Sequence, residues 1–263
     1  MNIRGSFIGG QSMSRILPAF CSVVVALASS CSFAIAADPQ ARTVVLVHGA
    51  FADGSSWQKV IPLLQDAGLK VIAVQNPLES LEGDVAFTKR AIRDAEGPVV
   101  LVGHSWGGVV ITEAGGDPKV KSLVYVAAYA PDAGQSLVDV ASKYPDQESR
   151  TTYVKDEDGY LKITDDGISK YFAAGLSPEE KELVAVVQGR FHVRATTAPV
   201  KHPAWRDKPS FMVVASDDRI ISPALQRDQV KTANAKMVEV PSGHVAMLSH
   251  PEDVAEIIVK AAQ

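Results

Sequence analysis

The stretch Val99–Gly108, which reads VVLVGHSWGG, decides the fold of this chain. It opens with four apolar residues, three of them β-branched, as expected for a strand that is buried on both faces. It ends in the pattern Gly-x-Ser-x-Gly, and the apolar run after it predicts a helix. A strand that turns sharply into a helix at a serine is a nucleophile elbow. The stretch therefore predicts that the hydroxyl of Ser105 lies at the tip of a sharp turn, facing open space.

The glycines of this stretch fit the same interpretation. Gly103 and Gly107 lack side chains, so the strand and the helix can pass close together at the turn. The helix that starts there directs free N–H groups and its positive dipole end toward the reacting centre. The alternative is an ordinary glycine-rich turn after a buried strand. The flanking strand and helix favour the nucleophile elbow.

Residues 1–36 differ from the rest of the chain and resemble a targeting segment. They contain Arg4 and Arg15 but no acidic residue, then an apolar run over 16–27, and they end in Ala34-Ile35-Ala36. This order is typical of a signal peptide, and the apolar run is too short to span a membrane. We therefore expect cleavage after Ala36, a mature domain over 37–263, and a periplasmic or secreted protein.

Two alternatives for this leader stay open. Translation could start at Met13, because 13–36 alone makes a complete signal peptide. The segment could also be a lipoprotein signal, with Cys31 as the modified residue. Three positions before Cys31 stands Ala28, where such signals usually carry leucine, and this disfavours the lipoprotein.

The composition of the mature chain excludes several classes of function. Both cysteines lie in the leader, so disulfides, a thiol nucleophile and zinc–thiolate sites are excluded. Losing the leader removes two basic residues and no acidic one, which changes the net charge from −4 to −6. This balance shows no footprint of a nucleic-acid or anionic-membrane partner.

Strands and helices alternate over most of the remaining chain. Besides the strand before Ser105, apolar runs predict strands over 42–47, 70–75, 121–127, 210–215 and 236–240, and helices are expected over 57–67, 84–95, 223–233 and 251–262. This alternation predicts an α/β fold with a mostly parallel sheet that carries helices on both faces.

The alternation is lost from about residue 133 to 209, and we interpret this segment as a cap inserted over the active site. Residues 152–154 and 160–163 flank a turn and predict a hairpin, and Ser177 with the proline after it predicts a helix start. The aromatic residues of the segment either line the substrate pocket or pack the cap on the core: Tyr171, Phe172, Phe191 and Trp205. Its two histidines, His192 and His202, are expected to be solvated or structural.

Candidate catalytic side chains follow the predicted strands. Ser105, the Asp217-Asp218 pair and His244 each fall just past a strand, and the carboxyl ends of parallel strands share one edge of the sheet. Their order, serine, acid, histidine, is the order found in α/β-hydrolases. The loop after the strand 42–47 is placed to supply a second oxyanion-hole donor, so the backbone N–H groups of Ala50 and Trp106 are the candidates. His48 in this loop is expected to be structural.

At these residues the sequence resembles the α/β-hydrolase fold superfamily. It is most similar to small serine esterases of the plant methylesterase and hydroxynitrile lyase branch and their bacterial relatives. The matching pieces are 46–50, 103–108, 126–132 and the Asp218 and His244 loops. The resemblance implies a Ser105–His244–Asp218 triad, an acyl-enzyme, a small-molecule ester substrate, and neither cofactor nor metal. In the similar esterases the triad acid precedes a short apolar step and a proline-led helix, a register that favours Asp218 over Asp217.

The resemblance also leaves other activities open. Hydroxynitrile lyases of this branch carry a lysine directly after the catalytic histidine, and here that residue is Val245, which disfavours lyase chemistry. Haloalkane dehalogenases and epoxide hydrolases, which are similar in fold, use aspartate in place of Ser105. A ligand-binding receptor that keeps the fold and the triad is a further alternative. Neither the particular ester nor the oligomeric state follows from the sequence.

Overall fold

The computed structural model describes residues 41–145 and 147–263. The expected signal peptide, its cleavage site after Ala36, the alternative start at Met13 and the alternative lipidation site at Cys31 lie outside the described residues. The part of the chain that follows begins with the first strand of the central sheet.

The centre of the fold is a six-stranded sheet in which every pairing is parallel. The strand order is β2-β1-β3-β4-β8-β9. The strands are β1 (Thr43–Val47), β2 (Lys70–Val74), β3 (Val99–His104), β4 (Val120–Val126), β8 (Ser210–Ala215) and β9 (Lys236–Val240). Every residue of β1, β3 and β8 is buried, as their continuous apolar sequences predict. The predicted α/β fold class is confirmed.

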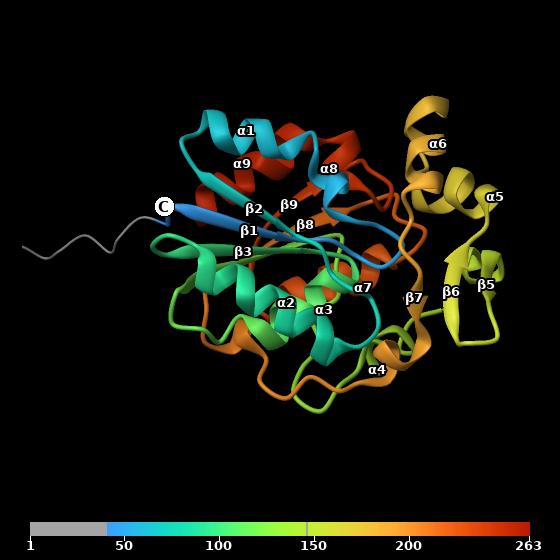
Figure 1. Ribbon diagram of the computed structural model, residues 1–263, viewed down its shortest axis with the longest axis horizontal. Helices are drawn as coiled ribbons and strands as arrows, with labels where there is room; N and C mark the ends of the chain where they lie inside the picture. Colours follow the sequence, from blue (N-terminus) through green and yellow to red (C-terminus); the bar gives the residue numbers. More distant parts are fainter. Residues whose placement is uncertain (1–40, 146) are drawn as a thin grey trace, which may run out of the picture. The chain divides into compact units, whose positions relative to one another are not determined.

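Helices cover both faces of this sheet (Figure 1). One face carries α1 (Val60–Asp66) and α9 (Pro251–Ala261), and the other carries α2 (Leu81–Asp94) and α3 (Trp106–Ala114). The remaining helices of the core are α7 (Pro223–Thr232) and the short α8 (Ala246–Ser249). Because parallel strands all end at the same edge, the loops after β1, β3, β8 and β9 meet there.

Most of the segment between β4 and β8, with β5, β6, β7, α5 and α6, lies beyond the carboxyl ends of the strands (Figure 1). It contains a small antiparallel sheet of β5 (Tyr153–Lys155), β6 (Tyr160–Ile163) and β7 (Phe191–His192). Its helices are α4 (Leu137–Ala141), α5 (Asp165–Gly167) and α6 (Pro178–Val186), and its short helical turns are η2 (Glu148–Thr152), η3 (Ile168–Phe172), η4 (Val193–Thr197) and η5 (Ala204–Arg206). The structure confirms the predicted hairpin and the predicted helix start at Ser177, which forms a capping box with Glu180.

Two predicted helices begin elsewhere in the structure. The expected helix over 57–67 is a short turn, η1 (Gly54–Trp57), followed by α1. The expected helix over 84–95 begins three residues earlier, because the hydroxyl of Ser80 accepts a hydrogen bond from the N–H of Gly83 and caps it. Asp84 therefore belongs to the first turn of α2, where it is buried.

Within residues 41–145 and 147–263, no helix is both long and apolar enough to cross a membrane. The same residues contain no group of three or more His, Cys, Asp or Glu side chains that could hold a metal ion.

Candidate active site

Ser105 lies at the turn between β3 and α3 in a backbone conformation that side chains rarely adopt. Its φ is 52° and its ψ is −119°, which is strained for a residue other than glycine. A Cβ at Gly103 would overlap the backbone of Gly107, and one at Gly107 would overlap the carbonyl of Val47. Only glycine permits this close approach, so the structure has the sharp turn that the Gly-x-Ser-x-Gly pattern predicts.

The structure brings His244 and Asp218 together at the same edge of the sheet. Nδ1 of His244 lies 2.9 Å from Oδ2 of Asp218, and both side chains are fully buried. The Asp218 carboxylate also accepts hydrogen bonds from the backbone N–H groups of Ile220 and Ile221, at 2.8 and 3.0 Å. Such a carboxylate is held in one orientation and fixes the ring of its histidine partner.

Asp217, the neighbouring acid, points elsewhere. It is exposed, and its backbone N–H donates to the carbonyl of Ser242 at 3.0 Å. Of the two candidates, the structure places Asp218 against His244. Gln226 on α7 adds a hydrogen bond from Nε2 to Oδ2 of Asp218 at 2.8 Å, a contact that no motif in the sequence marks.

The other ring nitrogen of His244, Nε2, makes no contact with Asp218. Nε2 is buried and has no hydrogen-bond partner in the described part of the chain. Both residues line one cavity. Because Nδ1 is occupied by Asp218, Nε2 is the nitrogen that is left to exchange a proton with a group in the cavity.

His104, a variable position of the Gly-x-Ser-x-Gly motif, contacts His244. Its Nε2 donates to the carbonyl of His244 at 3.0 Å, and the two ring centroids lie 4.7 Å apart. Burial, reinforced by the neighbouring His244, lowers the pKa of His104 well below its usual value. His104 is therefore neutral at neutral pH and adds no positive charge beside His244.

The loop after β1 lies next to the serine turn, because Val47 at the end of β1 pairs with Gly103 on β3. Ala50 in this loop lines the same cavity as Ser105 and Trp106. Trp106 is the first residue of α3, so its backbone N–H has no acceptor within the helix. The two candidate oxyanion-hole donors thus border the cavity around Ser105.

His48 in the same loop forms hydrogen bonds with two backbone groups. Its Nε2 accepts a hydrogen bond from the N–H of Asn76 at 2.9 Å, and its Nδ1 donates to the carbonyl of Gly49 at 2.8 Å. Burial lowers the pKa of His48. His48 was expected to be structural, and its two hydrogen bonds tie the β1 loop to the β2 loop.

The cavity above Ser105 measures about 250 Å³ and is mostly apolar. Two of the four cap aromatics proposed for its lining, Phe172 and Phe191, do line it. The other two do not: Nε1 of Trp205 donates to the carbonyl of Pro131, and Tyr171 packs against the guanidinium of Arg219. Further apolar walls that sequence reasoning missed are Phe51, Tyr129, Leu137, Tyr153, Leu161 and Ile220.

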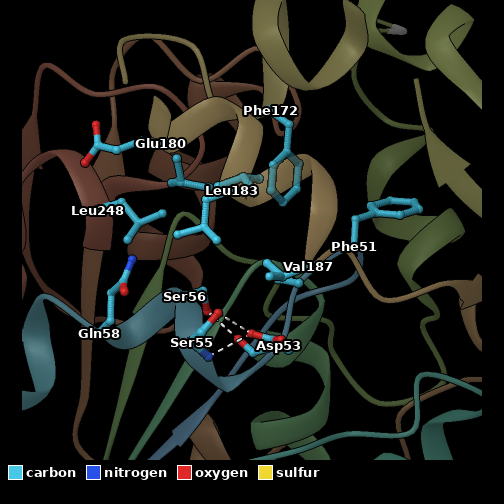
Figure 2. Close-up of a pocket in the computed structure, with 13 residues that line it drawn as sticks. Phe51, Asp53, Ser55, Ser56, Gln58, Phe172, Glu180, Leu183, Val187 and Leu248 are labelled. Atoms are coloured by element: carbon cyan, nitrogen blue, oxygen red, sulfur yellow. Dashed lines mark hydrogen bonds between the residues drawn. The ribbon is translucent and has the colours of Figure 1, made fainter. Parts of the chain in front are cut away.

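A second pocket of about 30 Å³ lies between η1 and α6 (Figure 2). Its polar side contains Asp53, whose carboxylate accepts hydrogen bonds from Ser55, and its apolar side contains Leu183. Phe51 and Phe172 line both pockets, with their rings edge to face at 6.4 Å. None of the candidate catalytic residues borders the small pocket, whereas Ser105 and His244 line the larger cavity.

Comparison with known protein families agrees with this geometry. The sequence model described as "Alpha/beta hydrolase family" matches residues 44–257. The chain belongs to the alpha/beta hydrolase family. The match includes the serine turn, the Asp218 loop and the His244 loop, so it extends across the whole central sheet.

Three similar proteins represent the branches named from the sequence. The alpha-hydroxynitrile lyase of Arabidopsis thaliana is 27% identical over 79% of this chain and 92% of its own length. The pyrethroid hydrolase of Sphingobium wenxiniae is 26% identical over 83% of this chain and 87% of its own length. Among solved structures, polyneuridine aldehyde esterase superposes on this chain with a TM-score of 0.73. A protein of the same name from Rauvolfia serpentina is also similar in sequence. That structure is 21% identical and covers 85% of this chain and 100% of its own, and it supports the fold.

Proposed function

We propose that the protein is a carboxylic ester hydrolase in which Ser105, His244 and Asp218 form the catalytic triad. The observation that carries the proposal is the buried His244–Asp218 hydrogen bond beside a strained serine turn, with the free Nε2 and Ser105 bordering one cavity. His104, whose pKa is lowered well below its usual value by burial, adds no positive charge beside His244. The similar pyrethroid hydrolase supports the reaction class.

The proposed reaction has two halves. His244 Nε2 removes the proton of Ser105 as its oxygen attacks the ester carbonyl, and the same nitrogen then protonates the departing alcohol. The acyl group stays on Ser105 until water, activated by His244, releases the carboxylic acid. The N–H groups of Ala50 and Trp106 stabilise the oxyanion of both tetrahedral intermediates, at about 3–4 kcal/mol for each donor. Asp218 stabilises the imidazolium.

The cavity suggests the substrate class. At about 250 Å³ with aromatic and aliphatic walls, it suits small to medium esters with an apolar acyl or alcohol group. We expect the mature protein to hydrolyse p-nitrophenyl esters with kcat/KM falling once the acyl chain outgrows the cavity. Aryl methyl esters would be assayed beside them. Rapid multiple turnover is expected, whereas a single slow turnover with tight product binding would instead indicate a ligand-binding receptor.

The similar hydroxynitrile lyase makes cyanohydrin cleavage the second candidate function. Val245 follows His244 directly, and its side chain is buried and apolar, so no ammonium group lies at this position to stabilise departing cyanide. We expect no cyanide release above background from cyanohydrins under conditions where esters are hydrolysed. Cyanide release at a rate similar to ester hydrolysis would reverse this assignment.

We also propose that the protein is exported and trimmed. The basic start, the apolar run and Ala34-Ile35-Ala36 carry this proposal. Mass spectrometry of periplasmic or secreted protein is expected to find an N-terminus at Ala37 or within a few residues of it. Retention of Met1 or Met13 on cytoplasmic protein would contradict export, and a lipid on Cys31 would establish the lipoprotein instead.

A further inference from the structure

We propose that Asp84 is a positioning residue that fixes Trp106, and with it one oxyanion-hole N–H group, and ties the cap to the same point. This inference rests on the proposed ester hydrolysis. Asp84 is fully buried in the first turn of α2 and is not among the residues that line the Ser105 cavity. Its Oδ2 accepts a hydrogen bond from Nε1 of Trp106 at 2.7 Å. The carboxylate therefore holds the side chain of the residue that directly follows Ser105.

The second oxygen of Asp84 holds the loop that docks the cap. Oδ1 accepts a hydrogen bond from the N–H of Leu78 at 2.9 Å, and Leu78 has a positive φ of 60°, which costs conformational energy. The carbonyl of Leu78 accepts the N–H of His192 on β7, at 3.0 Å. The indole of Trp106 packs on Phe191 of the same strand, with ring centroids 5.0 Å apart. One carboxylate thus joins the serine turn to the cap strand.

Glu79, next to Leu78, strengthens this junction from the solvent side. Its carboxylate accepts hydrogen bonds from the guanidinium of Arg194 at 2.6 Å and from the hydroxyl of Tyr160 at 2.5 Å. Both donors belong to the cap. A shift of the cap is therefore transmitted to the 78–79 loop, and through Asp84 to Trp106. Since displacing a catalytic group by about 1 Å can lower a rate about a hundredfold, holding this point has a kinetic consequence.

The charge of Asp84 is costly to the fold. Burial raises its pKa to about 6, with a further increase from the facing charge of Glu79, and the Trp106 and Leu78 hydrogen bonds offset only part of this. The folded pKa lies above the ordinary value of 3.8, so stability falls as pH rises from about 4 through about 6. The N–H groups of Leu78 and Trp106 nevertheless each need an acceptor oxygen at this position, and a carboxylate supplies both.

The decisive variant is Asp84→Asn, which keeps the shape but turns an NH₂ group toward one of the two donors. At about pH 8 we expect kcat on a p-nitrophenyl ester to fall about 10- to 100-fold, with KM changed far less. The difference in melting temperature, variant minus wild type, should rise as pH rises from about 4 to about 6 and then level off, because only the wild type ionises a buried carboxyl group. A residue with a purely structural role would instead lose stability and activity together.

Two further variants make the test specific. Thr88→Val alters the next buried polar side chain on α2, whose hydroxyl has no partner among the described residues, and wild-type kcat is expected. Trp106→Phe removes the indole N–H, and the Asp84→Asn/Trp106→Phe double variant should be no slower than the slower single variant, because both changes break one interaction. Independent, multiplying effects would overturn the proposal, as would wild-type kcat in Asp84→Asn. If the wild type itself hydrolyses no ester, the proposed function fails instead.

Discussion

Ser105→Ala is expected to reduce ester hydrolysis by about a millionfold, to the level left by binding and the oxyanion hole. The substitution removes only the hydroxyl that attacks the carbonyl carbon. Alanine has the same Cβ as serine, so the strained backbone at φ 52° is neither relieved nor worsened. The fold should therefore persist, with an unchanged melting temperature. Purified variant and wild type would be compared on one p-nitrophenyl ester.

A fluorophosphonate probe identifies the nucleophile independently of turnover. It should label the wild type at one site and leave Ser105→Ala unlabelled. The matched control is Ser55→Ala, which removes an exposed hydroxyl bonded to Asp53 and should be labelled like the wild type. Equal labelling of Ser105→Ala and wild type would remove Ser105 from the mechanism.

Asp218→Asn is expected to lower kcat by up to about ten-thousandfold while the fold is retained. An amide at this position can turn its NH₂ group toward Nδ1 of His244, which then lacks its acceptor. The imidazole adopts the tautomer with its proton on Nε2, and that nitrogen can no longer take the proton of Ser105. The effect is large because the 2.9 Å contact to Asp218 is what leaves Nε2 as the base.

Asp217→Asn is the matched control, one residue away in the same loop. Asp217 is exposed, and it contributes a backbone N–H to Ser242, which asparagine keeps. We expect a loss of about tenfold or less, through loop geometry alone. Circular dichroism and melting temperatures of both variants would exclude unfolding. If Asp217→Asn lost most of its activity while Asp218→Asn stayed active, the assignment of Asp218 as the catalytic acid would be wrong.

Much of the fold could be predicted because its signals are local. A buried parallel strand reads as a continuous apolar run, and β1, β3 and β8 show such runs. The turn at Ser105 needs glycine at two close backbone approaches, so the motif reports geometry directly. The start of α2 could not be predicted from the apolar pattern, because it depends on the side chain of Ser80, the N-cap residue of this helix.

The lining of the cavity could not be predicted from aromatic content. Trp205 and Phe191 both belong to the segment between β4 and β8, yet one donates to a core carbonyl and the other faces the cavity. Whether an aromatic residue faces the cavity or the core depends on how the chain between β4 and β8 runs, and that part of the sequence has no regular hydrophobic period. The contact of Gln226 with Asp218 likewise joins residues whose meeting follows from how α7 packs.

The sequence by itself determined the sheet, the serine turn and the short set of side chains that parallel topology carries to one edge. Of the two adjacent aspartates, the register of the similar esterases favoured Asp218, and the structure places that carboxylate against His244. Tertiary structure alone decided that Asp84 is buried against Trp106. The physical reason is that the hydrophobic period of a strand or helix and the residue preferences of a turn are set by a few neighbouring residues. The orientation of a carboxylate depends on donors contributed by distant segments, which meet only when the chain has folded.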